Sequence, residues 1–201
     1  MKGCGSTAHY FTDNRNLDEN RKVHTFRFSG HVFSFTTDNG VFSKTGVDYG
    51  TEVLLECCKD IHGEVLDLGC GYGVVGIVLK TLYDCTVTAV DINPRAVELT
   101  QLNSSLNHAE VTAVVSDGFE NLAGRRFSFV ITNPPIRAGK QTIYGMFDDA
   151  LAHLETGGVL LAVIRRKQGA ESALRRLTET FGNCETIGKD KGYWVLKCVK
   201  Q

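Results

Sequence analysis

The feature that most constrains the fold is a glycine-rich turn between an apolar run and a helical pattern. Residues 65–68 predict a strand, and the segment GCGYGVVG (69–76) that follows them opens a helix. Glycines let the backbone turn tightly and let a ligand approach it closely. Three of these glycines also satisfy the spacing G-x-G-x-x-G of a dinucleotide-binding turn. A strand, a glycine turn and a helix in succession predict a βαβ unit and therefore a parallel sheet.

Strand and helix patterns alternate along most of the remaining chain. Strands are expected over 65–68, 86–91, 111–116, 127–132 and 159–164. Helices are expected over 48–59, from the glycine turn to 82, and over 94–107, 143–154 and 170–181. Gly157-Gly158 is expected to end the fourth helix. Segments 184–188 and 193–199 predict a closing hairpin. The expected fold is α/β: a Rossmann-like, doubly wound, seven-stranded sheet, mostly parallel, with one antiparallel edge-hairpin strand.

A small N-terminal β-unit precedes this core. Residues 23–42 alternate between apolar and polar, and a turn at Ser29-Gly30 places Phe26 opposite Phe33. The phenylalanines at 26, 28, 33 and 35 then share one face. We expect a single domain, with a β-hairpin extension (1–46) packed over the sheet of the core (47–201). The aromatic face covers either the domain or a second copy of the chain, which leaves a homodimer open.

Composition excludes several classes of protein. The chain has 201 residues, 42% of them hydrophobic, which suits one domain with a full core. The net charge of -1 provides no general basic field, so nucleic acid would need a local patch. No apolar run reaches the roughly 18 residues of a membrane span, and the N-terminus lacks a signal peptide. Seven cysteines without a CxxC pair and six scattered histidines predict reduced thiols, no metal site and a cytoplasmic protein.

Two aspartates narrow the choice of cofactor. Asp91 ends the strand after the glycine turn, about 20 residues beyond Gly71, where a carboxylate can accept the ribose hydroxyls. Asp67 lies inside the preceding strand, where a carboxylate is costly without a cation or hydrogen-bond donors. S-adenosylmethionine carries an ammonium group, whereas a pyrophosphate would be repelled. A nicotinamide-binding oxidoreductase is the alternative, although Tyr193 and Lys197, spaced as in short-chain dehydrogenases, lie in a strand pattern.

Further motifs carry a family resemblance. DLGCGYGVVG, VDINPRAVEL, SDGF and ITNPP occur in that order, after GVFSKTGVDYGTEVLL. Together they resemble the class I S-adenosylmethionine-dependent methyltransferases, and within them the "small domain" group that includes ribosomal RNA guanine-N2 methyltransferases. The resemblance runs from about residue 23 to residue 199. It implies that the cofactor is S-adenosyl-L-methionine.

The resemblance also implies cofactor-binding roles at the ends of three strands. The residues are Asp67 at the methionine ammonium, Gly69, Cys70 and Gly71 along the methionine part, Asp91 at the ribose hydroxyls, Ile92 on the adenine ring, and Asp117 at the adenine amine, with Phe119 packing nearby. Asp117 also suits an ordinary turn, because Ser-Asp-Gly is common turn chemistry.

The resemblance implies that Asn133-Pro134-Pro135 is the catalytic motif. The Asn133 side-chain oxygen and the Pro134 carbonyl can accept the two N–H groups of an exocyclic amine, and Pro135 stiffens the loop. Many amine methyltransferases have an aromatic residue after the two prolines, where this chain has Ile136. Adenine N6 and glutamine amides are therefore less expected targets, while Ile136 can still pack on a ring.

Basic residues at the same strand ends indicate the substrate. Arg137 and Lys140 follow the motif, Arg165 and Arg166 follow the fifth strand, and Lys44 is expected at the edge of the site. The two clusters after the motif and after the fifth strand predict a rim that binds phosphates of RNA. The expected partner is ribosomal RNA or a ribosomal subunit, and the expected target is guanine N2. Alternatives are another RNA base, a protein amide, or a non-catalytic RNA-binding factor.

Overall fold

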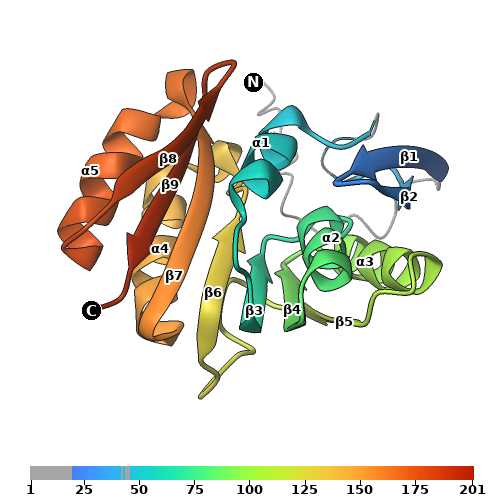
Figure 1. Cartoon of the computed structure of the whole chain (residues 1–201), viewed down its shortest axis with the longest axis horizontal. Coiled ribbons are helices and arrows are strands. Elements are labelled where there is room, and N and C mark those ends of the chain that lie inside the picture. Colours follow the sequence, from blue (N-terminus) through green and yellow to red (C-terminus); the bar gives the residue numbers. More distant parts are fainter. Residues whose placement is uncertain (1–19, 42, 44–45) are drawn as a thin grey trace, which may run out of the picture.

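A computed structural model describes residues 20–41, 43 and 46–201 (Figure 1). Its main sheet has seven strands in the order β5-β4-β3-β6-β7-β9-β8. The strands are β3 (Gly63–Leu68), β4 (Cys85–Asp91), β5 (Val111–Val115), β6 (Phe127–Thr132), β7 (Leu154–Arg165), β8 (Glu185–Asp190) and β9 (Tyr193–Val199). Neighbouring strands are parallel, except that β9 is antiparallel to β7 and β8. This confirms the doubly wound sheet with an antiparallel strand in its edge hairpin.

Helices cover both faces of the sheet (Figure 1). They are α1 (Tyr49–Cys57), α2 (Val74–Leu82), α3 (Pro94–Leu106), α4 (Lys140–His153) and α5 (Ala170–Phe181), with short 3-10 turns at Ile136–Ala138 and Arg166–Gln168. The first three helices pack into one hydrophobic core and the last two into the other. Among the described residues, no helix has the length and apolar character needed to cross a bilayer.

Strand order reverses between β3 and β6, and ligands of open α/β sheets bind at such a reversal. The two strand ends are joined there by a hydrogen bond, because the Thr132 hydroxyl donates to the Leu68 carbonyl at 2.8 Å. The ligand-binding end of such a reversal is the one formed by the carboxyl ends of the parallel strands. The residues just after β3, β4 and β6 therefore lie close together at one edge of the sheet.

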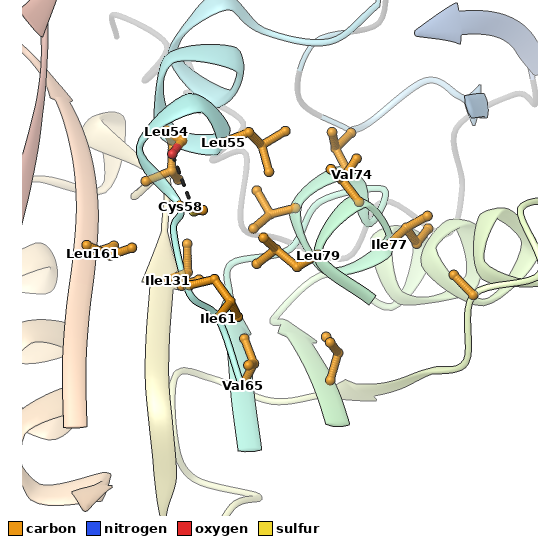
Figure 2. Close-up of a cluster of buried hydrophobic side chains, with 14 of the residues drawn as sticks. Leu54, Leu55, Cys58, Ile61, Val65, Val74, Ile77, Leu79, Ile131 and Leu161 are labelled. Carbon is orange, nitrogen blue, oxygen red and sulfur yellow. Dashed lines mark hydrogen bonds between the residues drawn. The ribbon is translucent and has the colours of Figure 1, made fainter. Parts of the chain in front are cut away.

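One hydrophobic cluster fixes α1 and α2 over the middle of the sheet (Figure 2). Leu54 of α1 and Ile77 of α2 are fully buried, and they share this cluster with Val65 of β3 and Ile131 of β6. Each such side chain contributes roughly 1.5–3 kcal/mol on burial. The cluster thereby anchors α1 in a position that brings its N-terminus to the end of β6.

The N-terminal unit is a two-stranded hairpin of β1 (Lys22–Phe28) and β2 (His31–Thr37). Phe26 pairs with Phe33 as predicted, and the four phenylalanine rings contact one another on one face. The hairpin packs against α3 and the Tyr72 ring, 5.9 Å from Phe35, and not over the main sheet as expected. The glycine turn, which carries Tyr72, is thus part of the surface that receives the hairpin.

Asn103 of α3 and Asn107, the C-cap of this helix, complete the outer edge of β2. The Asn103 and Asn107 side-chain oxygens accept the backbone N–H groups of Thr36 and Ser34 at 2.7 and 2.9 Å. Their amide nitrogens donate back to the carbonyls of the same two residues. The side chains therefore act as a substitute strand and satisfy an edge that would otherwise be open to pairing.

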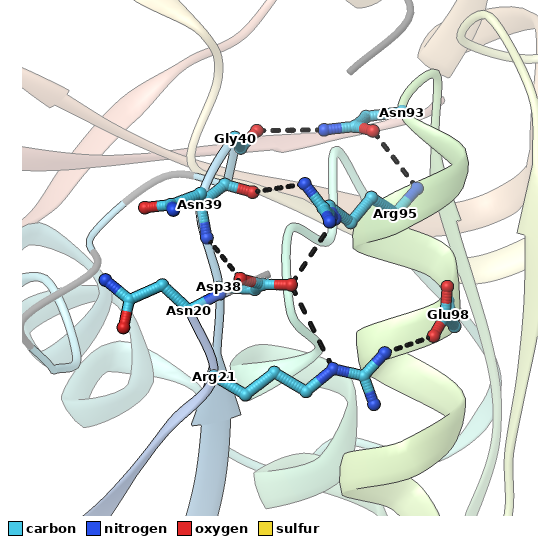
Figure 3. Close-up of polar contacts among 8 residues, drawn as sticks. All are labelled: Asn20, Arg21, Asp38, Asn39, Gly40, Asn93, Arg95 and Glu98. Atoms are coloured by element: carbon cyan, nitrogen blue, oxygen red, sulfur yellow. Dashed lines mark hydrogen bonds and ion pairs between the residues drawn. The ribbon is translucent and has the colours of Figure 1, made fainter. Parts of the chain in front are cut away.

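A buried carboxylate holds the segment after β2 onto α3 (Figure 3). Asp38 is 2% exposed, and its Oδ2 lies 3.4 Å from Arg95 Nε and 4.0 Å from Arg21 Nε. Asn93, the N-cap of α3, donates from its side chain to the Gly40 carbonyl at 3.0 Å. These contacts tie the hairpin to the loop that directly follows β4.

The prediction that Gly157-Gly158 ends the fourth helix is wrong. Helix α4 ends at His153, and β7 begins at Leu154 and contains both glycines. Both glycines pair with the backbone of Lys200. The Gly157 N–H donates to the Lys200 carbonyl, and the Lys200 N–H donates to the Gly158 carbonyl. A Cβ at Gly158 would lie 3.0 Å from the Phe127 carbonyl oxygen. Glycine is needed there because β6 passes close by.

Candidate active site

Three polar side chains predicted from the sequence lie at the strand reversal. Asp67 is the penultimate residue of β3, Asp91 ends β4 and Asn133 directly follows β6. Because β3 pairs with both β4 and β6, the two aspartates and the asparagine surround the same end of β3.

Asp67 is the most buried of the three. It is 2% exposed, and its Oδ2 accepts the Gly76 backbone N–H of α2 at 2.9 Å. Burial raises the pKa of this carboxyl to about 7, and the nearby Asp91 charge acts in the same direction, while the Gly76 N–H opposes them. A cation placed against Asp67 would therefore stabilise its ionised form.

The Asp91 carboxylate links the two loops that flank it. Its Oδ2 accepts the Gly71 N–H and its Oδ1 accepts the Asn93 N–H, both at 2.9 Å. Burial raises the pKa of Asp91, and these two N–H bonds oppose that rise. Each carboxylate oxygen can accept a second hydrogen bond, so the side chain can also receive hydroxyl donors.

The glycine turn leaves open space beside Gly69 and Gly71, and the N–H groups of Gly69, Cys70 and Gly71 already have partners within the protein. Gly69 and Gly71 have φ of 75° and 57°, and a Cβ built on either would meet no atom within 4 Å. The N–H groups of Gly69 and Cys70 both donate to the Val90 carbonyl at 2.9 Å. The Cys70 side chain is buried against the Thr100 hydroxyl, and burial raises its pKa. Backbone can thus be approached closely at the two glycines.

The other two glycines of the motif serve packing. A Cβ at Gly73 would lie 2.8 Å from the Thr100 side chain, and one at Gly76 would lie 3.1 Å from Val87. They allow α2 and α3 to pack closely against each other and against the sheet.

Three further predicted cofactor residues follow β4 and β5, in different surroundings. Ile92 is 36% exposed immediately after β4. Asp117 is exposed in a turn after β5 in which its carbonyl accepts the Glu120 N–H. Phe119 is buried in the second hydrophobic core and stacks on His153 at 4.5 Å. Ile92 and Asp117 are therefore accessible to a ligand, whereas Phe119 packs in the core and anchors the turn after β5.

Asn133 is held by hydrogen bonds to the N-terminus of α1, a contact that the sequence did not predict. Its amide nitrogen donates to Thr51 Oγ1 at 3.0 Å and to Asp48 Oδ2 at 3.3 Å, both at the N-terminus of α1. Among the described residues, no donor bonds to Asn133 Oδ1. Pro134 is buried, and Pro135 leads into the 3-10 turn that begins at Ile136.

The predicted basic rim is only partly brought together. Arg137 lies in the 3-10 turn after the two prolines, and Lys140 begins α4. Arg165 is exposed at the end of β7, with its guanidinium 5.6 Å from the Tyr193 ring centroid. Arg166 forms an ion pair with Glu171 at 3.2 Å, which offsets its charge. Lys44 lies outside the described residues.

Comparison with known proteins agrees with this geometry. Residues 32–197 match the family described as methyltransferase small domain. The chain belongs to this family. That membership argues against the nicotinamide alternative, and the Tyr193–Lys197 spacing indeed lies on strand β9.

The relatives that this chain resembles differ in length. YbxB of Bacillus subtilis, an uncharacterized protein, is 39% identical over 96% of this chain and 99% of its own. Ribosomal RNA large subunit methyltransferase G of Pectobacterium atrosepticum is 31% identical over 87% of this chain. The small subunit methyltransferase C of Aliivibrio salmonicida is 29% identical over 98% of it. This chain spans 48% and 57% of those two enzymes, about half their length.

Among solved structures, a similar one is the T. thermophilus 16S rRNA N2 G1207 methyltransferase RsmC in complex with AdoMet and guanosine. Its TM-score is 0.83 at 29% identity, over 90% of this chain and 51% of that one.

Proposed function

We propose that this protein transfers a methyl group from S-adenosyl-L-methionine to an exocyclic amine, and that the amine is N2 of a guanine in ribosomal RNA. The observation that carries the proposal is the Asn133 amide at the strand reversal, which has its oxygen available as an acceptor. Family membership and the named relatives support the same chemistry.

The residues around the glycine turn fit this cofactor. The open space over Gly69 and Gly71 lets a ligand lie against backbone, and Asp91 at the end of β4 keeps lone pairs for ribose hydroxyls. Asp67, with its raised pKa, favours a neighbouring cation such as an ammonium group. In this proposal the exposed Ile92 and Asp117 contact the adenine. When bound, the cofactor supplies an activated methyl group on a sulfonium centre.

The chain's own part in the reaction is to orient the target amine. The lone pair of an exocyclic amine is delocalised into its ring, so the nitrogen is a weak nucleophile. Asn133 Oδ1 and the Pro134 carbonyl accept its two N–H groups and favour a pyramidal nitrogen with an available lone pair. Pro135 restricts Pro134 to extended backbone, which keeps the two acceptors in a fixed relation.

Two features favour guanine in RNA over other amines. Ile136 follows the prolines and provides apolar contact for a base without the aromatic stacking platform of many adenine and amide methyltransferases. Lys140 and Arg165 lie at the ends of neighbouring elements on the same edge of the sheet and can neutralise phosphates. The target base must be unpaired or flipped out of a helix to reach Asn133.

The test is transfer of a radiolabelled methyl group to each ribosomal subunit, to extracted ribosomal RNA and to total protein, followed by nucleoside analysis. We expect label in N2-methylguanosine from one ribosomal fraction. An Asn133→Ala variant should lose transfer but bind the cofactor normally in calorimetry, because its contacts are to the amine. Label in another nucleoside, label only in protein, or none in any fraction would overturn the proposal.

A further inference from the structure

The side chain of Asn133 is anchored by residues that precede and open α1. Asp48 is the N-cap of this helix, and its Oδ2 accepts the Gly50 backbone N–H at 3.0 Å. The same oxygen lies 3.3 Å from Asn133 Nδ2, which also donates to the buried Thr51 hydroxyl at 3.0 Å. Both hydrogens of the Asn133 amide are therefore used within the protein.

Asp48 determines the orientation of the Asn133 side-chain amide. An ionised carboxylate can only accept hydrogen bonds, whereas the hydroxyl of Thr51 can donate or accept. If the Asn133 amide were turned over, its oxygen would replace Nδ2 beside Asp48 Oδ2, and two acceptors would oppose each other. The nitrogen must therefore face α1, and Oδ1 must face away from it. The helix cap keeps the Asp48 carboxylate itself in place.

We propose that Asp48 is a positioning residue that turns the Asn133 oxygen toward the target amine, with Thr51 as a second acceptor. This inference rests on the proposed function, and it makes Asp48 a determinant of specificity. A site that offers two oxygen acceptors suits an –NH2 group, which has two donors. A keto oxygen or an unprotonated ring nitrogen would bring lone pairs against lone pairs and be rejected.

The decisive comparison is Asp48→Ser against Asp48→Asn. Serine caps a helix about as well as aspartate but is too short to reach Asn133, whereas asparagine keeps both the cap and an oxygen at full reach. In labelled methyl transfer, we expect Asp48→Ser to lower kcat about tenfold to a hundredfold. The affinity for the cofactor should stay within about twofold, and Asp48→Asn should restore most of the activity.

A double-mutant cycle separates positioning from a general structural effect. If Asp48 acts through Asn133, then Asp48→Ser should cause little further loss of kcat in an Asn133→Ala background. Glu56→Gln, an exposed change on the same helix, serves as the matched control and should leave kcat unchanged. Equal losses from Asp48→Ser in the two backgrounds, or equal losses from Asp48→Ser and Asp48→Asn, would overturn the inference.

A readout without turnover keeps the inference testable if the wild type proves inactive in every methyl-transfer assay. In NMR spectra, the two side-chain amide protons of Asn133 should exchange slowly with solvent in wild type and in Asp48→Asn. Exchange should be markedly faster in Asp48→Ser, because the carboxylate no longer holds the amide. Equal exchange in all three proteins would refute the positioning role, whereas failed transfer with the expected exchange pattern would refute only the proposed function.

Discussion

At the scale of single residues, the buried Asp67 carboxyl makes stability depend on pH. Its pKa is raised from 3.8 to about 7 in the folded chain, so the folded state holds this proton more tightly than the unfolded state. The stability that the protonated carboxyl contributes is complete below pH about 4 and is lost as the pH rises toward and through 7.

Asp67→Asn tests this account, because an amide keeps an acceptor for the Gly76 N–H and cannot ionise. In urea denaturation from pH 4 to 8, the wild type should lose stability relative to the variant by at most about 1.4 kcal/mol per pH unit. Asp84→Asn, at an exposed position, is the matched control and should follow the wild type. Parallel curves for wild type and Asp67→Asn would contradict the prediction.

Residues of the site differ in how far the sequence could predict them. Asp67, Asp91 and Asn133 stand at the ends of recognisable strands, so their meeting at one edge follows from the parallel sheet. Asp48 and Thr51 are separated from Asn133 by 85 and 82 positions. In the sequence, Asp48 has only the ordinary signature of a helix cap, and no local pattern reveals that its carboxylate also reaches another loop.

At the scale of elements, the N-terminal hairpin is docked through buried phenylalanines and also through polar contacts. Asp38 lies buried between Arg95 and Arg21, and α3 supplies the asparagines that complete the edge of β2. Asn93 connects the same region to the loop after β4 that carries Ile92. Docking of the hairpin is therefore expected to stabilise the loops around the predicted cofactor site.

Asp38→Ala should be strongly destabilising, since it leaves the Arg95 guanidinium, largely buried, without its carboxylate. We expect the free energy of unfolding to fall by about 3 kcal/mol in urea denaturation. Glu98→Ala removes an exposed partner of Arg21 and should cost less than about 1 kcal/mol. Similar losses in the two variants would show that Asp38 is no more than a surface ion pair.

Element boundaries show where local patterns mislead. The hairpin register was predictable because the Ser29-Gly30 turn and the alternation of phenylalanines act within a few residues. The role of Gly157-Gly158 was not, because glycine suits both a helix end and a crowded strand. Only the tertiary pairing with Lys200 and the approach of Phe127 distinguish these two roles.

At the scale of the whole molecule, the alternation of strands and helices was sufficient to predict the sheet and its reversal point. What the alternation could not predict is the placement of the hairpin on α3 instead of over the sheet. That docking depends on long-range partners such as Asn103 and Tyr72, which no periodicity reveals. The chain spans about half the length of the relatives that are named as ribosomal RNA methyltransferases.

The most direct test of the central claim is nucleoside mass spectrometry of ribosomal RNA from cells that lack the gene. We predict that one N2-methylguanosine disappears in the deletion strain, returns when the wild-type gene is restored, and stays absent with the Asn133→Ala gene. An unchanged N2-methylguanosine content in the deletion strain, or full restoration by Asn133→Ala, would contradict the account.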